Sequence, residues 1–174
     1  MPASREQTET GIGAGATVFP VSVIMERRPV HGNRWVTESW QAIGVTVGAA
    51  RQGQAENPLP LIEDGGVARF LWSGLRVELF ADEAESYYHN LMVPNPGCYV
   101  IVRPLDDGTP EPFLVTLSFD AAQAYQEGDE TAYNVPLPPE LYRAAEAFVI
   151  AHYVPEKKKK RKLDNWKGQA HARP

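Results

Sequence analysis

Apolar and polar residues alternate along several segments of the chain. Between Phe19 and Met25 every second residue is apolar, and the intervening positions include Pro20 and Ser22. An alternation with a period of two is typical of a β-strand that buries one of its faces. This alternation, or a composition rich in β-branched and aromatic residues, recurs and predicts strands near residues 19–26, 35–46, 68–72, 75–80, 98–103 and 113–119.

Residues that favour turns separate these predicted strands. Residues 28–33 contain Pro, Gly and Asn, and they predict a hairpin between the first two strands. Gly74 interrupts the next two β-prone segments, where it predicts a tight turn or a β-bulge. Residues 48–66 collect Gly, Gln, Asn and two prolines, and they predict a long mobile connection. Hairpin connections imply that the strands pair in antiparallel fashion.

One long helix is predicted in the last third of the chain. Pro138 and Pro139 precede a stretch, from about residue 139 to residue 153, in which apolar residues recur at helical spacing. Phe148 lies centrally on the apolar face and is predicted to anchor the helix to the sheet. The residues of this face are Leu141, Ala145, Phe148, Val149 and His152.

Two shorter helices are predicted between strands. Asp82–Glu85 has the spacing of a capping box before a short helix, with an extended Tyr87–Val93 segment as the alternative. Asp120 is predicted to cap a further short helix, which Gly128 ends. The predicted fold class is therefore α+β and mainly β: an antiparallel barrel or sandwich of about six strands, with short helices and one C-terminal helix packed on it.

Charge is distributed unevenly along the chain. Lys157–Pro174 contains eight Lys or Arg residues and one acidic residue, whereas residues 1–156 contain nine basic and 21 acidic residues. A run of like charges repels itself and stays in contact with water. We therefore predict a disordered N-terminal arm over residues 1–17, a single globular domain over 18–156 and a basic tail over 157–174. The predicted partner-binding residues are Lys157, Lys158, Lys159, Lys160, Arg161 and Lys162.

The sequence contains no recognisable catalytic, cofactor or metal site. The four His residues are separated along the chain and Cys98 is the single cysteine, so that neither a zinc site nor a disulfide is expected. Cys98 is predicted to be a small packing residue. Acidic clusters at residues 82–85 and 127–130 are predicted to be solvated turns rather than acid–base pairs. We expect a non-catalytic protein that needs no cofactor.

Seven aromatic residues have two interpretations. They can build the hydrophobic core, or they can stack on nucleic-acid bases beside the basic tail. The core is favoured because several of them alternate with polar residues. The set is Trp35, Trp40, Phe70, Trp72, Tyr87, Tyr88 and Tyr99.

Hydropathy and the first residues of the chain indicate the cellular location of the protein. No segment approaches the roughly 20 apolar residues that a membrane-spanning helix needs. The first residues mix Arg5 with Glu6 and Glu9, which differs from the cationic start of a signal peptide. We expect a soluble, cytoplasmic protein.

Three stretches together resemble a known family. They are Phe19–Pro29 followed by Trp35 and Trp40, Leu75–Pro104, and Phe113–Pro138. Over roughly residues 18 to 162 the chain resembles the bacterial domain-of-unknown-function family 3305, whose members are small uncharacterised proteins usually encoded beside genes of molybdenum-dependent formate dehydrogenases. Members tend to end in a helix and a Lys/Arg-rich tail, but Val154-Pro155-Glu156 departs from the aromatic-Lys-Arg step expected after that helix.

The resemblance implies a context and no catalytic residues. That context is cytoplasmic formate oxidation and the assembly of its molybdenum and iron–sulfur enzyme. We therefore expect a non-catalytic accessory or binding protein, whose partner is a formate dehydrogenase subunit or one of its assembly factors. Two alternatives remain: a nucleic-acid-binding module that uses the basic tail, and an enzyme with an unrecognised carboxylate site.

Overall fold

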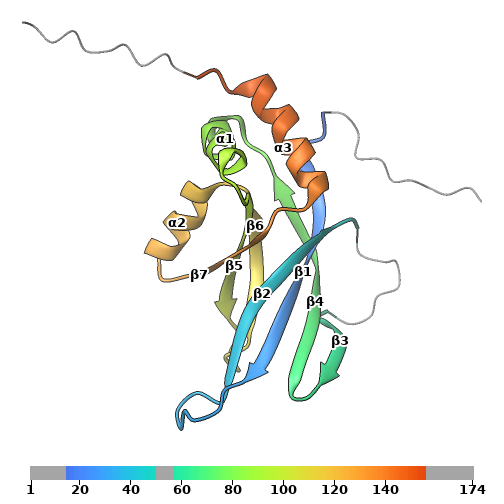
Figure 1. Cartoon of the computed structure of the whole chain (residues 1–174), viewed down its shortest axis with the longest axis vertical. Helices are drawn as coiled ribbons and strands as arrows, with labels where there is room; N and C mark the ends of the chain where they lie inside the picture. Colours follow the sequence, from blue (N-terminus) through green and yellow to red (C-terminus); the bar gives the residue numbers. More distant parts are fainter. Residues whose placement is uncertain (1–14, 50–56, 156–174) are drawn as a thin grey trace, which may run out of the picture.

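Two antiparallel sheets form the body of the protein in the computed structural model, which describes residues 15–49 and 57–155 (Figure 1). The large sheet has the strand order β2-β1-β4-β3, and the small sheet has the order β6-β5-β7. The large sheet consists of β1 (Val18–Pro29), β2 (Glu38–Val47), β3 (Leu59–Asp64) and β4 (Val67–Glu78), and the small sheet of β5 (Gly97–Pro104), β6 (Pro110–Thr116) and β7 (Thr131–Pro136).

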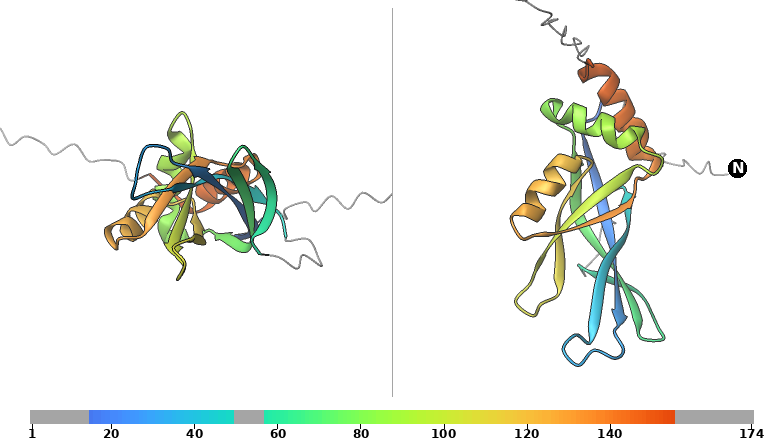
Figure 2. Two further views of the ribbon diagram at one scale, coloured as in Figure 1. Left: turned by 90° about the horizontal axis from the view of Figure 1, so that it is seen from below. Right: turned by 60° about the vertical axis from the view of Figure 1, so that its left-hand side comes forward.

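Three α-helices lie at one end of the molecule, while the β1–β2 and β3–β4 hairpins extend to the other end (Figures 1 and 2). A short 3-10 turn at Ala81–Glu83 follows β4 and leads directly into the first helix. The helices are α1 (Ala84–Met92), α2 (Phe119–Glu127) and α3 (Pro139–His152). No helix among the residues described is long and apolar enough to cross a membrane.

The two sheets share one hydrophobic core. The alternating apolar side chains of β1, from Phe19 to Met25, are buried together with residues of β5 and β6 such as Val100 and Val115. In the described residues, backbone ladders join strands within each sheet and do not close the two sheets into one barrel. The facing sheets therefore fit the sandwich among the two predicted architectures, and the mainly β fold with a C-terminal helix is confirmed.

β4 confirms the irregularity predicted at Gly74. The segments predicted as two strands form one, in which the register against β1 shifts between Trp72 and Leu75. Gly74 has a φ angle of +84°, a conformation that L-residues with a Cβ rarely adopt. A β-bulge at this glycine lets the strand continue on the far side of the irregularity.

Several local predictions need correction. β3 forms inside the stretch predicted to be a mobile connection, and β7 was not predicted at all. Residues 84–92 form a helix, which excludes the extended alternative for Tyr87–Val93. Phe119 begins α2 instead of ending a strand, and the backbone N–H of Ala121 bonds to the side chain of Ser118, so that Ser118 and not Asp120 caps this helix.

α3 packs on α1 through the predicted apolar face. Leu141, Ala145 and Val149 are buried, and the ring of Phe148 meets the ring of Tyr87 edge-on at 6.1 Å between centroids. His152, the last residue predicted on this face, is exposed, and its ring packs on that of Phe148 with 4.2 Å between centroids. Phe148 is thus enclosed between α1 and the last turn of its own helix.

The side-chain amide of Asn90 joins α1 to the small sheet. Its Nδ2 donates to the carbonyl oxygens of Gly97 and Leu117 at 2.8 and 2.9 Å, and its Oδ1 accepts from the N–H of Gly97 at 3.0 Å. Asn90 is buried, so these three backbone groups have little access to water. One side chain therefore provides the hydrogen-bond partners of buried backbone groups at Gly97, the first residue of β5, and at Leu117, directly after β6.

Candidate functional site

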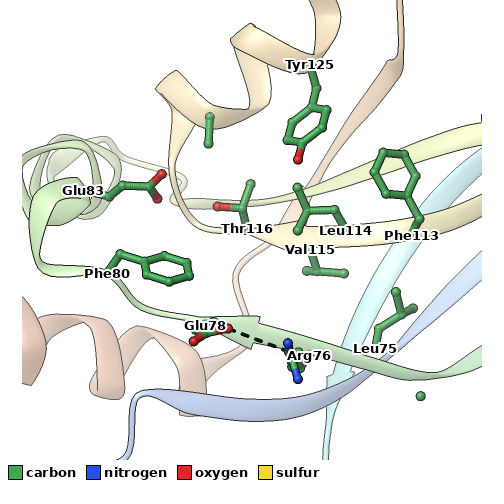
Figure 3. A pocket seen from close by; sticks show the side chains of 12 residues that line it. Leu75, Arg76, Glu78, Phe80, Glu83, Phe113, Leu114, Val115, Thr116 and Tyr125 are labelled. Carbon is green, nitrogen blue, oxygen red and sulfur yellow. Dashed lines mark ion pairs between the residues drawn. The ribbon is translucent and has the colours of Figure 1, made fainter.

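A groove with a volume of about 520 Å³ lies between β4 and β6, beside α2 (Figure 3). This volume falls in the range typical of small ligand sites, roughly 300–1,000 Å³. Phe80 and Glu83 enter the groove at one end and Phe113 at the other (Figure 3). The β4–β6 groove is lined by Gly74, Leu75, Arg76, Glu78, Phe80, Glu83, Phe113, Leu114, Val115, Thr116, Ala121 and Tyr125.

The β4 side of the groove begins where β3 stops. β3 pairs with β4 only as far as Leu71, and the side chain of Asn57 occupies the next position along the edge. The Nδ2 of Asn57 donates to the carbonyl oxygen of Ser73 at 3.1 Å, and the N–H of Ser73 donates to Oδ1 at 2.9 Å. Among the strands described, none pairs with this side of β4 beyond Ser73.

The register of β1 fixes the direction of the backbone groups in this part of β4. Gly48 donates to the carbonyl oxygen of Pro20, so the backbone groups of Pro20 face β2 rather than β4. Arg76 is the residue opposite Pro20, and in an antiparallel ladder directly opposed residues face each other or turn away together. The N–H and C=O groups of Arg76, and by alternation those of Glu78, therefore point away from β1 toward the uncovered edge.

The β6 side of the groove is the outer edge of the small sheet. The N–H of Leu105 donates to the carbonyl oxygen of Thr109 at 2.8 Å, which orients these two residues toward each other. By alternation, Pro110 and Pro112 turn their nitrogen atoms outward, and proline has no N–H to donate. These two prolines therefore contribute no donor to the outer edge of β6, next to the residues of β6 that line the groove.

Aromatic rings and charged groups line the groove together. Phe80 is 48% exposed and Tyr125 is 39% exposed, which leaves apolar surface open to a ligand. The rings of Phe113 and Tyr125 meet edge-on at 5.8 Å, and the guanidinium of Arg103 lies 3.6 Å from the centroid of Phe113. Such stacking fixes the ring of Phe113 at the mouth of the groove.

The carboxylates of the groove have partners. The Nε of Arg76 lies 3.8 Å from an oxygen of Glu78, and the hydroxyl of Tyr87 donates to Glu83 at 3.0 Å. Burial raises the pKa of the Tyr87 hydroxyl, which keeps it a donor at neutral pH. Two carboxylates and one guanidinium give the groove a net acidic lining, and its twelve lining residues include no His, Cys, Ser or Lys.

A second polar cluster lies outside the groove, around the buried carboxylate of Glu26. Arg28 bonds to one oxygen of this carboxylate, Arg69 donates to the other at 2.8 Å, and Gln41 donates from 3.3 Å. The hydrogen bonds from Arg28 and Arg69 lower the pKa of Glu26 from 4.5 to about 2. A carboxylate held ionised by two guanidinium groups is a poor proton donor or acceptor at neutral pH, so we assign it a structural role.

The lowered pKa of Glu26 predicts a pH-dependent contribution to stability. Because the folded-state pKa is below that of the unfolded chain, the ionised form stabilises the fold above about pH 4.5, and this stabilisation is lost as the pH falls toward 2. Glu26→Gln is expected to cost about 2 kcal/mol at neutral pH, discounted because both arginines are partly exposed. Denaturant unfolding of both proteins near neutral pH and near pH 3 measures the difference.

The same experiment contains its own control. The difference between wild type and Glu26→Gln should shrink at the lower pH, whereas Glu38→Gln, which removes an exposed carboxylate 3.8 Å from Arg27, should have a small effect at both. An equal cost of Glu26→Gln at both pH values would contradict the assigned ionisation.

The structure separates the other residues that the sequence singled out. Lys157, Lys158, Lys159, Lys160, Arg161 and Lys162 lie outside the described residues. Cys98 is buried in the core, and burial raises the pKa of its thiol to about 12, which confirms a packing residue. Of the two acidic clusters, the first contributes Glu83 to the groove. Within residues 15–49 and 57–155, no three His, Cys, Asp or Glu side chains gather as a metal site.

The aromatic set divides between core and surface. Trp72 and Tyr87 are buried, and Trp40, Phe70, Tyr88 and Tyr99 are partly buried. Trp35 is 85% exposed in the β1–β2 hairpin, so the prediction of a core position is wrong for this residue. The seven rings do not form one stacking platform, because they belong to both sheets, to α1 and to the connection between β1 and β2.

Comparison with known proteins gives one match. A family model described as "Protein of unknown function (DUF3305)" matches residues 20–162. No curated protein and no solved structure matches the chain.

Proposed function

The chain belongs to the DUF3305 family of proteins of unknown function, and we propose that it is a non-catalytic accessory protein that binds a protein partner. The partner is a formate dehydrogenase subunit or one of its assembly factors, and the binding serves maturation or assembly of the molybdenum-dependent enzyme. This context rests on the gene neighbourhood that the family resemblance implies.

The β4–β6 groove is the observation that carries the binding role. It combines exposed aromatic surface, an uncovered strand edge and a net acidic lining. A catalytic reading has less support, because the carboxylates at the groove are ion-paired or hydrogen-bonded and the thiol of Cys98 is buried elsewhere. Convergent apolar and polar groups in a concave site are typical of binding.

Capture of the full chain from its native cells tests this function. We expect an affinity-tagged chain to enrich a formate dehydrogenase subunit or assembly factor above an untagged control, measured by mass spectrometry. Cells that lack the chain should contain less active formate dehydrogenase, while addition of purified chain to mature enzyme should leave its turnover unchanged. Normal enzyme levels in those cells together with no enrichment would reject the proposal.

The basic tail gives a second test of partner binding. Lys157–Lys162 places six cations in six residues, and such a run favours electrostatic contact over burial. Deletion of residues 157–174 is expected to leave the thermal unfolding midpoint nearly unchanged. Binding of the captured partner should weaken most at low salt, because charges are screened beyond roughly 8 Å at physiological ionic strength.

A chain with all six cations replaced by glutamine is the matched control, since it keeps the length of the tail. It should lose the same salt-dependent part of the affinity as the deletion. If the truncated chain unfolds, or if it binds the partner with unchanged affinity at low salt, the proposal that the tail contributes to binding is wrong.

Nucleic-acid binding through the tail is a second candidate, favoured by the same run of cations. Binding of this kind depends steeply on salt and requires no formate dehydrogenase component. Retention of the full chain on double-stranded DNA at physiological salt, lost in the glutamine variant, would favour this candidate over the first.

A further inference from the structure

We propose that the β4–β6 groove holds an extended segment of the partner protein as an added strand on β4. The segment forms backbone hydrogen bonds with Arg76 and Glu78, and it carries alternating apolar side chains and at least one Lys or Arg. This inference rests on the proposed function, because it names the way in which the protein partner is held.

The backbone of β4 provides the first step of the argument. Arg76 and Glu78 both direct an N–H and a C=O toward the side of β4 that β3 leaves uncovered. Two residues that alternate along one edge are the repeat that an antiparallel partner strand requires. Peptides that extend an exposed sheet edge use main-chain bonds of this kind for affinity.

Asn57 marks where the covered part of the edge ends. Its side-chain amide bonds to both the N–H and the C=O of Ser73, as the peptide group of a neighbouring strand would. The described structure therefore satisfies β4 through Ser73 and leaves the following edge residues directed into the groove. An added strand would continue the line of β3 beyond Asn57.

The lining of the groove specifies the side chains of the segment. Alternate residues of an added strand point to opposite faces, so every second side chain meets the apolar surface of Phe80, Phe113 and Tyr125. The carboxylates of Glu78 and Glu83 outnumber the guanidinium of Arg76 in the lining. Residues 1–156 are also acidic as a whole, which favours a cationic segment over an acidic one.

The geometry suggests a matched pair of variants at one position. Arg76→Pro removes the outward N–H, and it loses no bond to β1 because the backbone groups of Arg76 point away from that strand. Arg76→Ala removes the same side chain and keeps the N–H. A difference between these two variants reports on the backbone contact alone.

Random dodecapeptides displayed on phage, selected against the full chain, provide the probe. We expect the selected peptides to alternate apolar residues and to contain Lys or Arg. Arg76→Pro should weaken the binding of a selected synthetic peptide by about tenfold or more, which corresponds to about 1.4 kcal/mol. Arg76→Ala should change it by less than about threefold, within the scatter of surface substitutions.

Charge is tested by a second pair of variants. Glu78→Gln should weaken binding of the cationic peptide at low salt and have less effect at high salt. Glu38→Gln lies at the opposite end of the large sheet, in β2, and should have no effect.

Amide hydrogen exchange gives a readout that does not depend on the proline variant folding. Addition of the selected peptide to the wild-type chain should slow exchange at the N–H groups of Arg76 and Glu78 by about tenfold or more. The N–H of Asn134, on β7, should exchange at the same rate with and without the peptide.

The outcomes separate this inference from the proposed function. Unslowed exchange at Arg76 and Glu78, or equal peptide affinity of folded Arg76→Pro and Arg76→Ala, overturns the added strand. Slowed exchange that accompanies dimerisation without peptide would identify a second copy as the occupant and would also overturn it. If the peptide results are as expected but the tagged chain enriches no formate dehydrogenase component, the proposed function fails and the mode of binding stands.

Discussion

Phe148→Ala is expected to lower the free energy of unfolding by about 3 to 5 kcal/mol, the cost typical of truncating a buried phenylalanine. Phe148 is 8% exposed and lies between Tyr87 of α1 and His152 of its own helix. Its loss leaves a cavity at the junction of two helices that are fixed by other contacts and cannot fully close it. Denaturant unfolding monitored by circular dichroism measures the change.

Ile150→Ala is the matched control for this prediction. Ile150 belongs to the same helix and is 79% exposed, so its truncation should change the free energy of unfolding by less than about 0.5 kcal/mol. If the two variants lose the same small amount, α3 does not depend on the contact between Phe148 and Tyr87.

Asn90→Ala is expected to cost about 3 kcal/mol, because it leaves three backbone groups of Gly97 and Leu117 without their partner. Each buried polar group that loses its hydrogen bond costs about 1–3 kcal/mol, and partial entry of water reduces the sum. The same denaturant titration measures this variant. Asn90→Asp should also destabilise, since it keeps an acceptor for the N–H of Gly97 but loses both donations.

Asn134→Ala serves as the control for an asparagine that is not buried. Asn134 is exposed on β7, in the same sheet as Gly97, and its truncation should have an effect near zero. If Asn90→Ala lowers the free energy of unfolding no more than Asn134→Ala does, the amide of Asn90 does not hold α1 to the small sheet.

The parts of the fold that could be predicted are those whose apolar residues recur at a regular spacing. β1 was found because apolar residues occupy every second position from Phe19 to Met25, and β6 because a similar alternation begins at Phe113, although the buried residues of β6 do not alternate. An irregularity at Gly74, either a tight turn or a bulge, was predicted because this glycine interrupts the β-prone segment, and α3 was predicted because its buried residues recur at helical spacing. In each case the signal is local to the element itself.

β3 and β7 could not be predicted, for a physical reason. β3 is an edge strand whose residues are exposed except for the partly buried Leu59, so burial imposes no alternation on it. In β7 only Val135 is fully buried. Both strands are specified by the neighbours with which they pair, β4 and β5, and pairing between distant segments leaves no pattern within a short stretch of sequence.

The candidate site could not be predicted from the sequence either. The alternation around Val77 indicates which side chains face the core, but it says nothing about which edge of the strand is covered. The groove exists because the pairing of β3 with β4 reaches only to Leu71 and because β6 and α2, which come later in the chain, lie opposite β4. Glu83 was singled out as an acidic turn residue, and only the fold places it in the groove.

The two prolines of β6 have a consequence for the behaviour of the protein in solution. A sheet edge with free donors recruits identical copies, which add one after another and lead to aggregation. Pro110 and Pro112 remove two donors from the outer edge of the small sheet, which weakens pairing of the start of β6 with a second copy. This part of the small sheet is therefore a poorer template for an added strand than the stretch of β4 at Arg76 and Glu78.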